Sequence, residues 1–180
     1  ARDFRIFSAW ARAYAPELKL TGPGGTAEGT MLKHGTGVGG VASLQSEDFL
    51  SRNPNSLDIV SYHHYGTVSP RCGPMKFGTL DSALSPDFLN LTALDYDFYA
   101  GLRDKYEPGK PLWLNETAQA ACGGAPWASS FADSFRYLNQ LGILAQKGVQ
   151  VVAHNTLAAS DYGLIDQDTL APRPNYWAAV

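Results

Sequence analysis

The chain has 180 residues, of which 44% are hydrophobic, 12% aromatic and 17% charged. This balance is typical of a folded globular domain and argues against a disordered segment or a coiled coil. The net charge is −3 and Lys and Arg form no run, so we expect no nucleic-acid partner. No apolar stretch reaches the roughly 18 residues that a membrane span needs, so we expect no membrane partner either.

The two cysteines, Cys72 and Cys122, are too few for a disulfide scaffold and could be free thiols or a single bridge. The sequence has no CxxC pair and no HExxH motif, so we expect no metal site. No GxGxxG motif directly follows an expected strand, which leaves a dinucleotide site without support. We therefore expect a protein that works without a cofactor.

The hydrophobic pattern predicts helices and short strands in alternation. A helix comes first, because apolar and aromatic residues recur at helical spacing from Phe4 to Tyr14, and Pro16 would end it. Ser85-Pro86 marks the start of a later helix, and apolar residues from Phe131 to Leu144 line one side of another. The expected strands are 18–21, 57–62, 111–115 and 149–153; the expected later helices are 47–52, 86–106, 128–147 and one from 175; and 24–46 is expected to be a loop.

Short apolar strands that alternate with helices predict an α/β fold with a parallel sheet covered on both faces, either doubly wound or a (β/α) barrel. Polar residues gather where three strands end, which is the edge that holds the active site in a barrel. A full barrel needs about 250 residues, so we interpret residues 1–180 as roughly the C-terminal half of one, incomplete at both ends. A complete four-stranded α/β domain is the alternative. The strand-end residues are His63, His64, Tyr65, Asn115, Glu116, His154 and Asn155.

Glu116 is the first candidate for a catalytic residue. It follows an apolar strand that ends in Trp113, Leu114 and Asn115, so its carboxylate should be partly desolvated and directed into the crevice at the strand ends. Glycoside hydrolysis uses two carboxyl groups, and in retaining enzymes one of them attacks the anomeric carbon. The simpler alternative is that Glu116 caps a loop or pairs with an Arg.

His63 and Tyr65 should lie on the same side of their strand, because side chains alternate, while His64 should point to the other side. A Tyr hydroxyl or an imidazole in the crevice could hold and orient the carboxylate of Glu116. The alternative is that these are hydrogen-bonded core residues.

Two further groups could bind a sugar. Gly123-Gly124 offers exposed backbone N–H groups that could bind an anion, although an ordinary turn has the same sequence pattern. Trp113, Trp127 and Tyr162 could stack on sugar rings, although aromatic residues belong more often to a core.

Several motifs resemble heparanase and its relatives in glycoside hydrolase family 79. The motifs are LKLTGPG, LDIVSYHHYG, GKPLWLNETAQAACGGAP, SFADSFRYLNQLGILAQKGVQVV, DYGLID and PRPNYW, which follow one another in the right order. The resemblance covers nearly the whole chain and is weakest in the loops at 25–46 and 66–88. It implies a retaining β-glucuronidase with a (β/α)8 TIM barrel, of which this chain would form strands five to eight, with Glu116 as the nucleophile.

The same resemblance implies roles for other residues. His63 and Tyr65 match strand-six residues beside the nucleophile. Cys122 and Gly123, with Gly124 in the same loop, match backbone that meets the carboxylate of the sugar.

Tyr162 matches a tyrosine that contacts the same sugar carboxylate. Asn155, another candidate for substrate binding, stands where mammalian members of the family have Gln, and Cys122 stands where they have Gly. The family's general acid/base is a Glu that follows an Asn, and the only Asn-Glu pair here is Asn115-Glu116. The acid/base should therefore lie outside this chain, and the chain alone should be inactive.

The expected partners are a carbohydrate with a glucuronic acid residue and the remaining part of the same barrel. Because the 14 Lys and Arg residues form no cluster, we expect a small glucuronide or a weakly sulfated chain. The alternatives are another retaining barrel glycosidase, of the arabinofuranosidase or xylosidase type, and a non-catalytic carbohydrate-binding relative. By the resemblance, Cys72 and Cys122 fall in neighbouring loops after strands six and seven. A disulfide there is a hypothesis that would fit a secreted, periplasmic or lysosomal enzyme.

Overall fold

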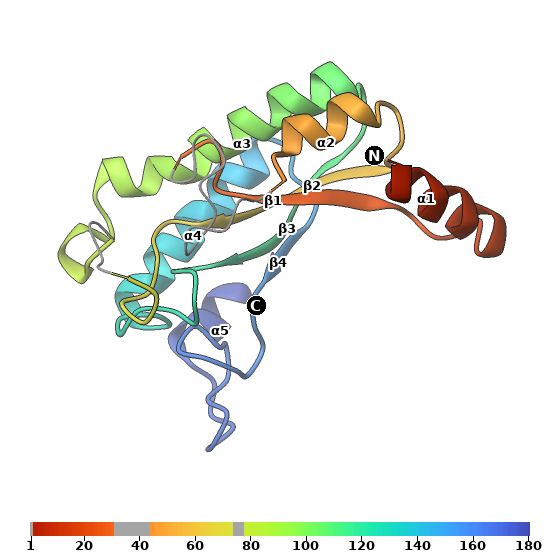
Figure 1. Ribbon diagram of the computed structural model, residues 1–180. Coiled ribbons are helices and arrows are strands. Elements are labelled where there is room, and N and C mark those ends of the chain that lie inside the picture. The colour runs from red at the N-terminus through yellow and green to blue at the C-terminus, as the bar shows by residue number, and fades with distance from the viewer. Residues whose placement is uncertain (1, 31–43, 74–77) are drawn as a thin grey trace.

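A computed structural model describes residues 2–30, 44–73 and 78–180. Four strands form one sheet in the order β1-β2-β3-β4, and all neighbours are parallel (Figure 1). The strands are β1 (Thr21–Thr26), β2 (Ile59–Tyr65), β3 (Leu112–Ala118) and β4 (Val152–His154). The helices are α1 (Arg2–Tyr14), α2 (Ser46–Arg52), α3 (Pro86–Tyr106), α4 (Phe131–Gln146) and α5 (Pro174–Ala179), with a short 3-10 helix η2 (Leu80–Ser82).

The strand order follows the chain order, so each connection moves one strand along the sheet in the same direction. A doubly wound sheet would instead reverse direction at a switch point. The predicted α/β fold with a parallel sheet is confirmed, and its stepwise order is the order that consecutive strands have in a barrel.

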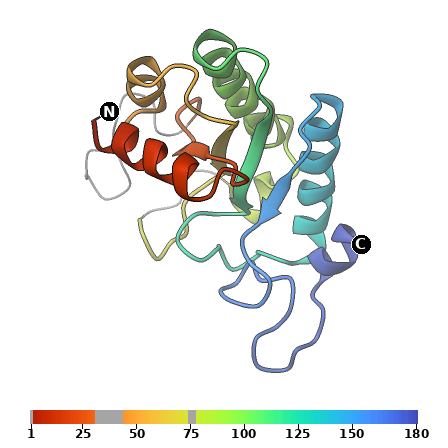
Figure 2. The same cartoon turned by 90° about the vertical axis from the view of Figure 1, so that its right-hand side faces the viewer.

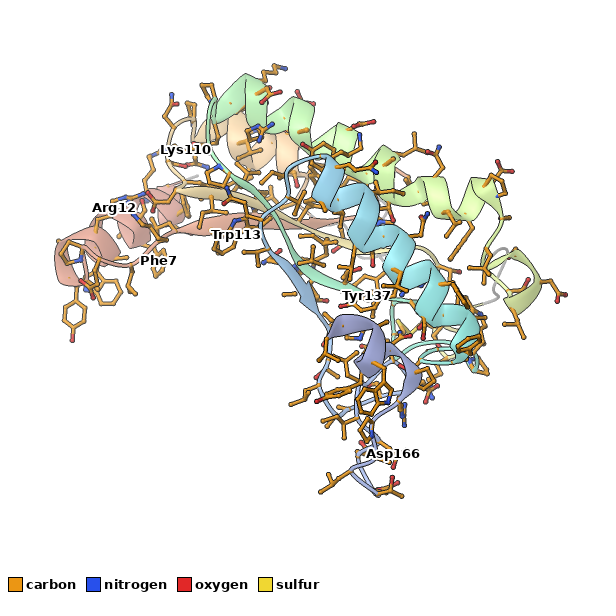
Figure 3. The ribbon with its side chains drawn as sticks, turned by 180° about the vertical axis from the view of Figure 1, so that it is seen from behind. Phe7, Arg12, Lys110, Trp113, Tyr137 and Asp166 are labelled. Carbon is orange, nitrogen blue, oxygen red and sulfur yellow. A yellow bond between two sulfur atoms is a disulfide. The ribbon has the colours of Figure 1, made fainter. Side chains whose placement is uncertain are left out.

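Helices α2, α3 and α4 cover one face of the sheet (Figure 1, Figure 2). The other face carries no helix from the described residues, so the expected cover on both faces is not seen there. In β3, Leu112 and Leu114 join the core beneath the helices, while Trp113 lies on the open face (Figure 3). The core residues are Leu50, Leu57, Val60, Tyr62, Tyr99, Leu102, Leu112, Leu114 and Leu144.

Strand β1 differs from the strand expected at 18–21. It is formed by TGPGGT, residues that were expected to end a strand rather than to make one. Glycine suits this strand because its surroundings are crowded: a Cβ at Gly25 would collide with the hydroxyl of Ser46 and come within 2.5 Å of the Glu28 carboxylate. The expected loop at 24–46 falls partly on residues 31–43, which lie outside the described residues.

Helix α4 buries mainly polar residues. Of the predicted apolar stripe, Leu144 is fully buried in the core, whereas Phe131 is 72% exposed and Phe135 50%. The apolar stripe therefore does not mark the buried face along the whole helix. Its buried residues are Asp133, Ser134, Arg136, Tyr137, Gln140 and Leu144.

Candidate active site

The carboxylate of Glu116 meets two side chains of the neighbouring strand β2. The hydroxyl of Tyr65 donates a hydrogen bond of 2.5 Å to Glu116 Oε1, and His63 Nδ1 lies 3.6 Å from Glu116 Oε2. His63 and Glu116 are directly paired across the β2–β3 ladder, so the sheet itself sets this geometry. The Glu116 side chain is 38% exposed, so a ligand can reach it.

A β-bulge places Glu116 on this side of the sheet. Glu116 was expected to follow the end of this strand, but it lies inside β3. Tyr62 pairs with Leu114 but His63 pairs with Glu116, so β3 has one extra residue, Asn115, at this point. A bulge of this kind reverses the alternation of side chains beyond it. Without it, Glu116 would share the helix-covered face with Leu114.

The expected alternation along β2 is seen in the contacts. His63 and Tyr65 both face Glu116, whereas His64 points toward the helices and its Nδ1 lies 2.6 Å from Asp95 Oδ2 on α3. His64 is thus a buried core residue, and of the HHY motif only His63 and Tyr65 belong to the site.

The two neighbours of Glu116 bring no charge to it at neutral pH. Burial raises the pKa of Tyr65, and Glu116 adds to that shift, so the phenol keeps its proton and remains a donor. Burial also lowers the pKa of His63 below its usual 6.5, against the opposing effect of Glu116. Tyr65 can therefore fix the orientation of the carboxylate without neutralising it.

Asn155 and Tyr162 extend this arrangement beyond β4. Asn155 Nδ2 donates to the hydroxyl of Tyr65 at 3.0 Å and lies 3.4 Å from the hydroxyl of Tyr162. Tyr162 packs in a small cluster with Tyr65 and Ala118. Tyr65 of β2 and two side chains after β4 are thus linked to Glu116 of β3 by a series of hydrogen bonds.

The loop after β3 lies against Tyr162. A Cβ added at Gly124 would come within 3.2 Å of the Tyr162 ring. Cys122, Gly123 and Gly124 have φ values of 64°, 87° and 91°, so three successive residues are in the left-handed region, where glycine is favoured. None of the hydrogen bonds formed within the described residues uses the N–H of Gly123 or Gly124. Gly123 is partly exposed, whereas Gly124 is buried.

A covalent bond and an ion pair hold this loop to its neighbours. Cys72 and Cys122 form a disulfide with a Cα–Cα distance of 6.3 Å, as hypothesised. Arg71 Nη1 donates to the Gly123 carbonyl at 3.0 Å, and Arg71 Nη2 lies 2.7 Å from Asp161 Oδ2. Sequence reasoning missed the pairing of Arg71 with Asp161, because it joins two loops that lie 90 residues apart. Their positions next to Cys72 and Tyr162 were the only available hint.

The two tryptophans that could have stacked on a sugar differ in position. Trp127 is buried with Phe88 and donates from Nε1 to the Gly78 carbonyl at 2.9 Å, so it is a core residue. Trp113 lies on the open face of the sheet (Figure 3).

Within the described residues, no three His, Cys, Asp or Glu side chains gather closely enough to hold a metal ion. Among the same residues, no helix has the length and apolar character needed to cross a bilayer.

Solved structures of glycoside hydrolases are similar to this chain in fold. A GH51 arabinofuranosidase from Xanthomonas axonopodis pv. citri matches 97% of this chain with a TM-score of 0.66 and 20% identity, over 36% of its own length. A monomeric beta-xylosidase from Caulobacter crescentus CB15 matches 97% of this chain with a TM-score of 0.64 and 18% identity, also over 36% of its length. Identities this low establish the fold and nothing about the substrate.

Sequence comparison identifies the family within that fold: the chain is a homologue of heparanase. No protein-family model matches it. It is 33% identical to the heparanase of Mus musculus over 134 residues, which are 73% of this chain and 24% of that protein. It is 38% identical to the hyaluronoglucuronidase of Hirudo nipponia over 77 residues, which are 42% of this chain and 16% of that protein. The resemblance to heparanase noted in the motifs is confirmed.

The chain spans about a quarter of the length of the heparanases that it matches. It is also 34% identical to the inactive heparanase-2 of Mus musculus over 76 residues, which are 42% of this chain and 13% of that protein. Because one relative is named as inactive, homology does not decide activity, which must be argued from the site.

Proposed function

We propose that this chain forms the nucleophile-bearing part of a retaining glycoside hydrolase that cleaves β-linked glucuronic acid residues from glucuronides or glycosaminoglycan-type chains. The observation that carries the proposal is the hydrogen bond from Tyr65 to the carboxylate of Glu116 at the carboxyl end of a parallel sheet. Enzymes with (β/α) barrels place their catalytic residues at this end of the sheet.

In the proposed reaction, a Glu116 oxygen attacks the anomeric carbon of the glucuronic acid residue while the bond to the leaving oxygen breaks. An acid protonates that leaving oxygen. Water then attacks the same carbon, passes a proton to the former acid, and releases Glu116. Tyr65 fixes the rotation of the carboxylate throughout, and the neutral His63 leaves it free to act as a nucleophile.

We propose that the acid/base lies in another part of the protein. Retaining enzymes need a second carboxyl group about 5–5.5 Å from the nucleophile. The family's Asn-Glu signature for this group occurs in this chain only at Asn115-Glu116, which is already assigned. On this basis the 180 residues alone are inactive.

We further propose that the sheet forms strands five to eight of a (β/α)8 barrel. The parallel, stepwise strand order supports this, as does the 36% share of the matched glycosidases that the chain covers. Ser61 Oγ, Trp113 Nε1 and Asn115 Oδ1 are buried without a hydrogen-bond partner in the described part of the chain. An unpaired buried polar atom costs roughly 1–3 kcal/mol, so further strands and side chains over the open face would give these atoms partners.

The glucuronic acid carboxylate would bind between Tyr162 and the loop of Cys122, Gly123 and Gly124. Successive backbone N–H groups in a turn can form a concave anion site, and the amide of Asn155 lies 3.4 Å from the Tyr162 hydroxyl. Among the described residues, Arg71 is the cation whose side chain bonds this loop, and it is paired with Asp161. A cation that is already paired supports a weakly sulfated or small substrate.

The alternative within the same fold is a retaining pentosidase, since the matched structures include an arabinofuranosidase and a xylosidase. It would use the same Glu116 but would have no need of acid recognition at Gly123 and Tyr162. The disulfide supports a secreted, periplasmic or lysosomal location for either enzyme, because such bonds persist in oxidising compartments.

The proposal is tested by trapping the covalent intermediate. The full-length enzyme is incubated separately with a 2-fluoro-glucuronide and a 2-fluoro-arabinofuranoside, and labelled peptides are mapped by mass spectrometry. We expect the glucuronide to label Glu116 and the pentoside to leave the enzyme unlabelled. Labelling at any other residue would overturn the nucleophile assignment, and labelling of Glu116 by the pentoside alone would overturn the substrate class.

Tyr65→Phe is expected to lower kcat by about 10- to 100-fold, because the carboxylate loses its orienting donor, while KM changes little. The measurement is steady-state hydrolysis of an aryl β-glucuronide by the full-length enzyme. Tyr14→Phe is a matched control, since Tyr14 is exposed on α1. An unchanged kcat in Tyr65→Phe would show that the hydrogen bond is incidental.

A further inference from the structure

A buried polar network lies directly behind Glu116, on the helix-covered side of β3. The hydroxyl of Thr117 donates to the His64 carbonyl at 2.7 Å and accepts from Gln140 Nε2 of α4 at 3.1 Å. Thr117 is fully buried and Gln140 is 1% exposed. This hydroxyl therefore joins β3 both to the neighbouring strand and to the helix layer, one residue after the proposed nucleophile.

The network continues through α4 to α5. Arg136 Nη1 donates to Gln140 Oε1 at 3.3 Å, and Arg136 Nε lies 2.5 Å from Asp133 Oδ1. Asp133 Oδ2 in turn accepts from Asn175 Nδ2 of α5 at 2.8 Å. A buried ion pair of this kind is weak evidence for stability, because well-packed apolar residues can replace it at little cost. Arg136 Nη2 is buried without a hydrogen-bond partner among the described residues, but the bonds that the other atoms make can still select one geometry.

The geometry that this network selects is the bulged register of β3. Beyond the extra residue Asn115, Thr117 lies where an unbulged strand would place Glu116, facing α4. If the bulge were lost, Glu116 would turn into the helix layer and Thr117 toward the open face, because a shift of one residue moves a strand's side chains to the opposite faces. Only the bulged register lets the Thr117 hydroxyl meet Gln140.

We propose that Thr117, anchored by Gln140, is a positioning residue that holds the bulge and so keeps Glu116 against Tyr65. The expected effect on turnover rests on the proposed function. The expected effect on the hydrogen bond between Tyr65 and Glu116 can be measured without any activity. Loss of the hydroxyl leaves Gln140 Nε2 without an acceptor and the His64 carbonyl without this donor, so the bulged register loses the two bonds that favour it.

Two substitutions at Thr117 separate positioning from packing. Thr117→Val keeps the volume and removes the hydroxyl, whereas Thr117→Ser keeps the hydroxyl and removes a methyl group. In the full-length enzyme we expect Thr117→Val to lower kcat by about 10- to 100-fold, the scale of loss that a displacement of about 1 Å can cause, with KM nearly unchanged. Thr117→Ser should keep a kcat near that of the wild type although its melting temperature falls.

The matched control is Thr92→Val on α3, made in a bacterial host because Asn90-Leu91-Thr92 is a glycosylation sequon. Thr92 is also buried, and its hydroxyl lies 3.4 Å from His64 Nε2, but it has no bond to β3. We expect this variant to keep its kcat. Gln140→Met removes the partner that anchors Thr117, so its kcat and KM should resemble those of Thr117→Val. It takes the place of Thr117→Val in the test if that variant does not fold.

Crystal structures of the variants supply the readout that does not depend on activity. The bond of 2.5 Å between Tyr65 Oη and Glu116 Oε1 should be lost or lengthened in Thr117→Val and kept in Thr117→Ser. A Thr117→Val enzyme with normal kcat and an intact bond overturns the inference. A fall in kcat in Thr117→Ser or Thr92→Val as large as the fall in Thr117→Val also overturns it. If trapping labels a residue other than Glu116 while the bond behaves as expected, the proposed function fails and the positioning role stands.

Discussion

Replacement of Glu116 by Gln is expected to lower kcat by about a thousandfold or more and to leave the fold intact. The amide has nearly the same shape and its oxygen can still accept the hydrogen bond from Tyr65, but it is too weak a nucleophile to form the glycosyl-enzyme bond. The side chain is 38% exposed, so loss of its charge removes no buried ion pair. Because the proposed mechanism passes through a covalent bond to Glu116, this variant should also resist labelling by the 2-fluoro sugar.

Turnover of an aryl β-glucuronide and thermal unfolding of the full-length protein are the two measurements. Glu47→Gln is the matched control, because Glu47 is exposed on α2 and its partners among the described residues are Lys105 and Tyr106. We expect that control to keep the turnover of the wild type. A Glu116→Gln enzyme that retained even a tenth of its kcat would contradict the assignment of the nucleophile.

Removal of the disulfide by replacing Cys72 and Cys122 with Ser is expected to lower the free energy of unfolding by about 4 kcal/mol. This is the loop-closure estimate for a sequence separation of 50 residues. The ion pair of Arg71 and Asp161 cannot compensate, because its side chains are 55% and 39% exposed and such pairs contribute roughly 0–1 kcal/mol. The loop of Cys122 and Gly123 would also lose its covalent link, so KM for a glucuronide should rise.

Urea unfolding and steady-state kinetics, both on the full-length enzyme, check this prediction. Dithiothreitol treatment of the wild type should reproduce both effects, and it should change neither property of the double variant. Loss of stability with an unchanged KM would mean that the disulfide supports the fold but not the proposed acid site.

Local signals predicted the elements whose ends depend on nearby residues. Helix α3 begins at Pro86 as expected, and the Ser85 side chain accepts from the Phe88 N–H as an N-cap. The alternation along β2 likewise followed from the sequence. In these cases the interactions that set the structure join residues only a few positions apart.

Features that depend on distant residues were missed. The glycine-rich strand β1 forms by pairing with β2, and Ser46 and Glu28 leave no room for a side chain at Gly25, which no local pattern reveals. The burial of polar residues on α4 depends on bonds from Gln140 to Thr117 and from Asp133 to Asn175. The same holds for the bulge at Asn115, since an extra residue in a ladder is visible only once both strands are paired.

The hydrogen bonds of Asn155 have a consequence for how the enzyme would choose between sugars. One amide group reaches the hydroxyl of Tyr65, which holds Glu116, and lies near the hydroxyl of Tyr162, which would meet the sugar acid. The amide of Asn155 would then serve both the binding of the sugar acid and the positioning of the nucleophile. A neutral sugar, which has no carboxylate for Tyr162 to bind, would leave Asn155 and hence Tyr65 less firmly fixed, and would be turned over slowly even at saturation. The enzyme would thus distinguish a glucuronide from a neutral sugar in the attack by Glu116 as well as in binding.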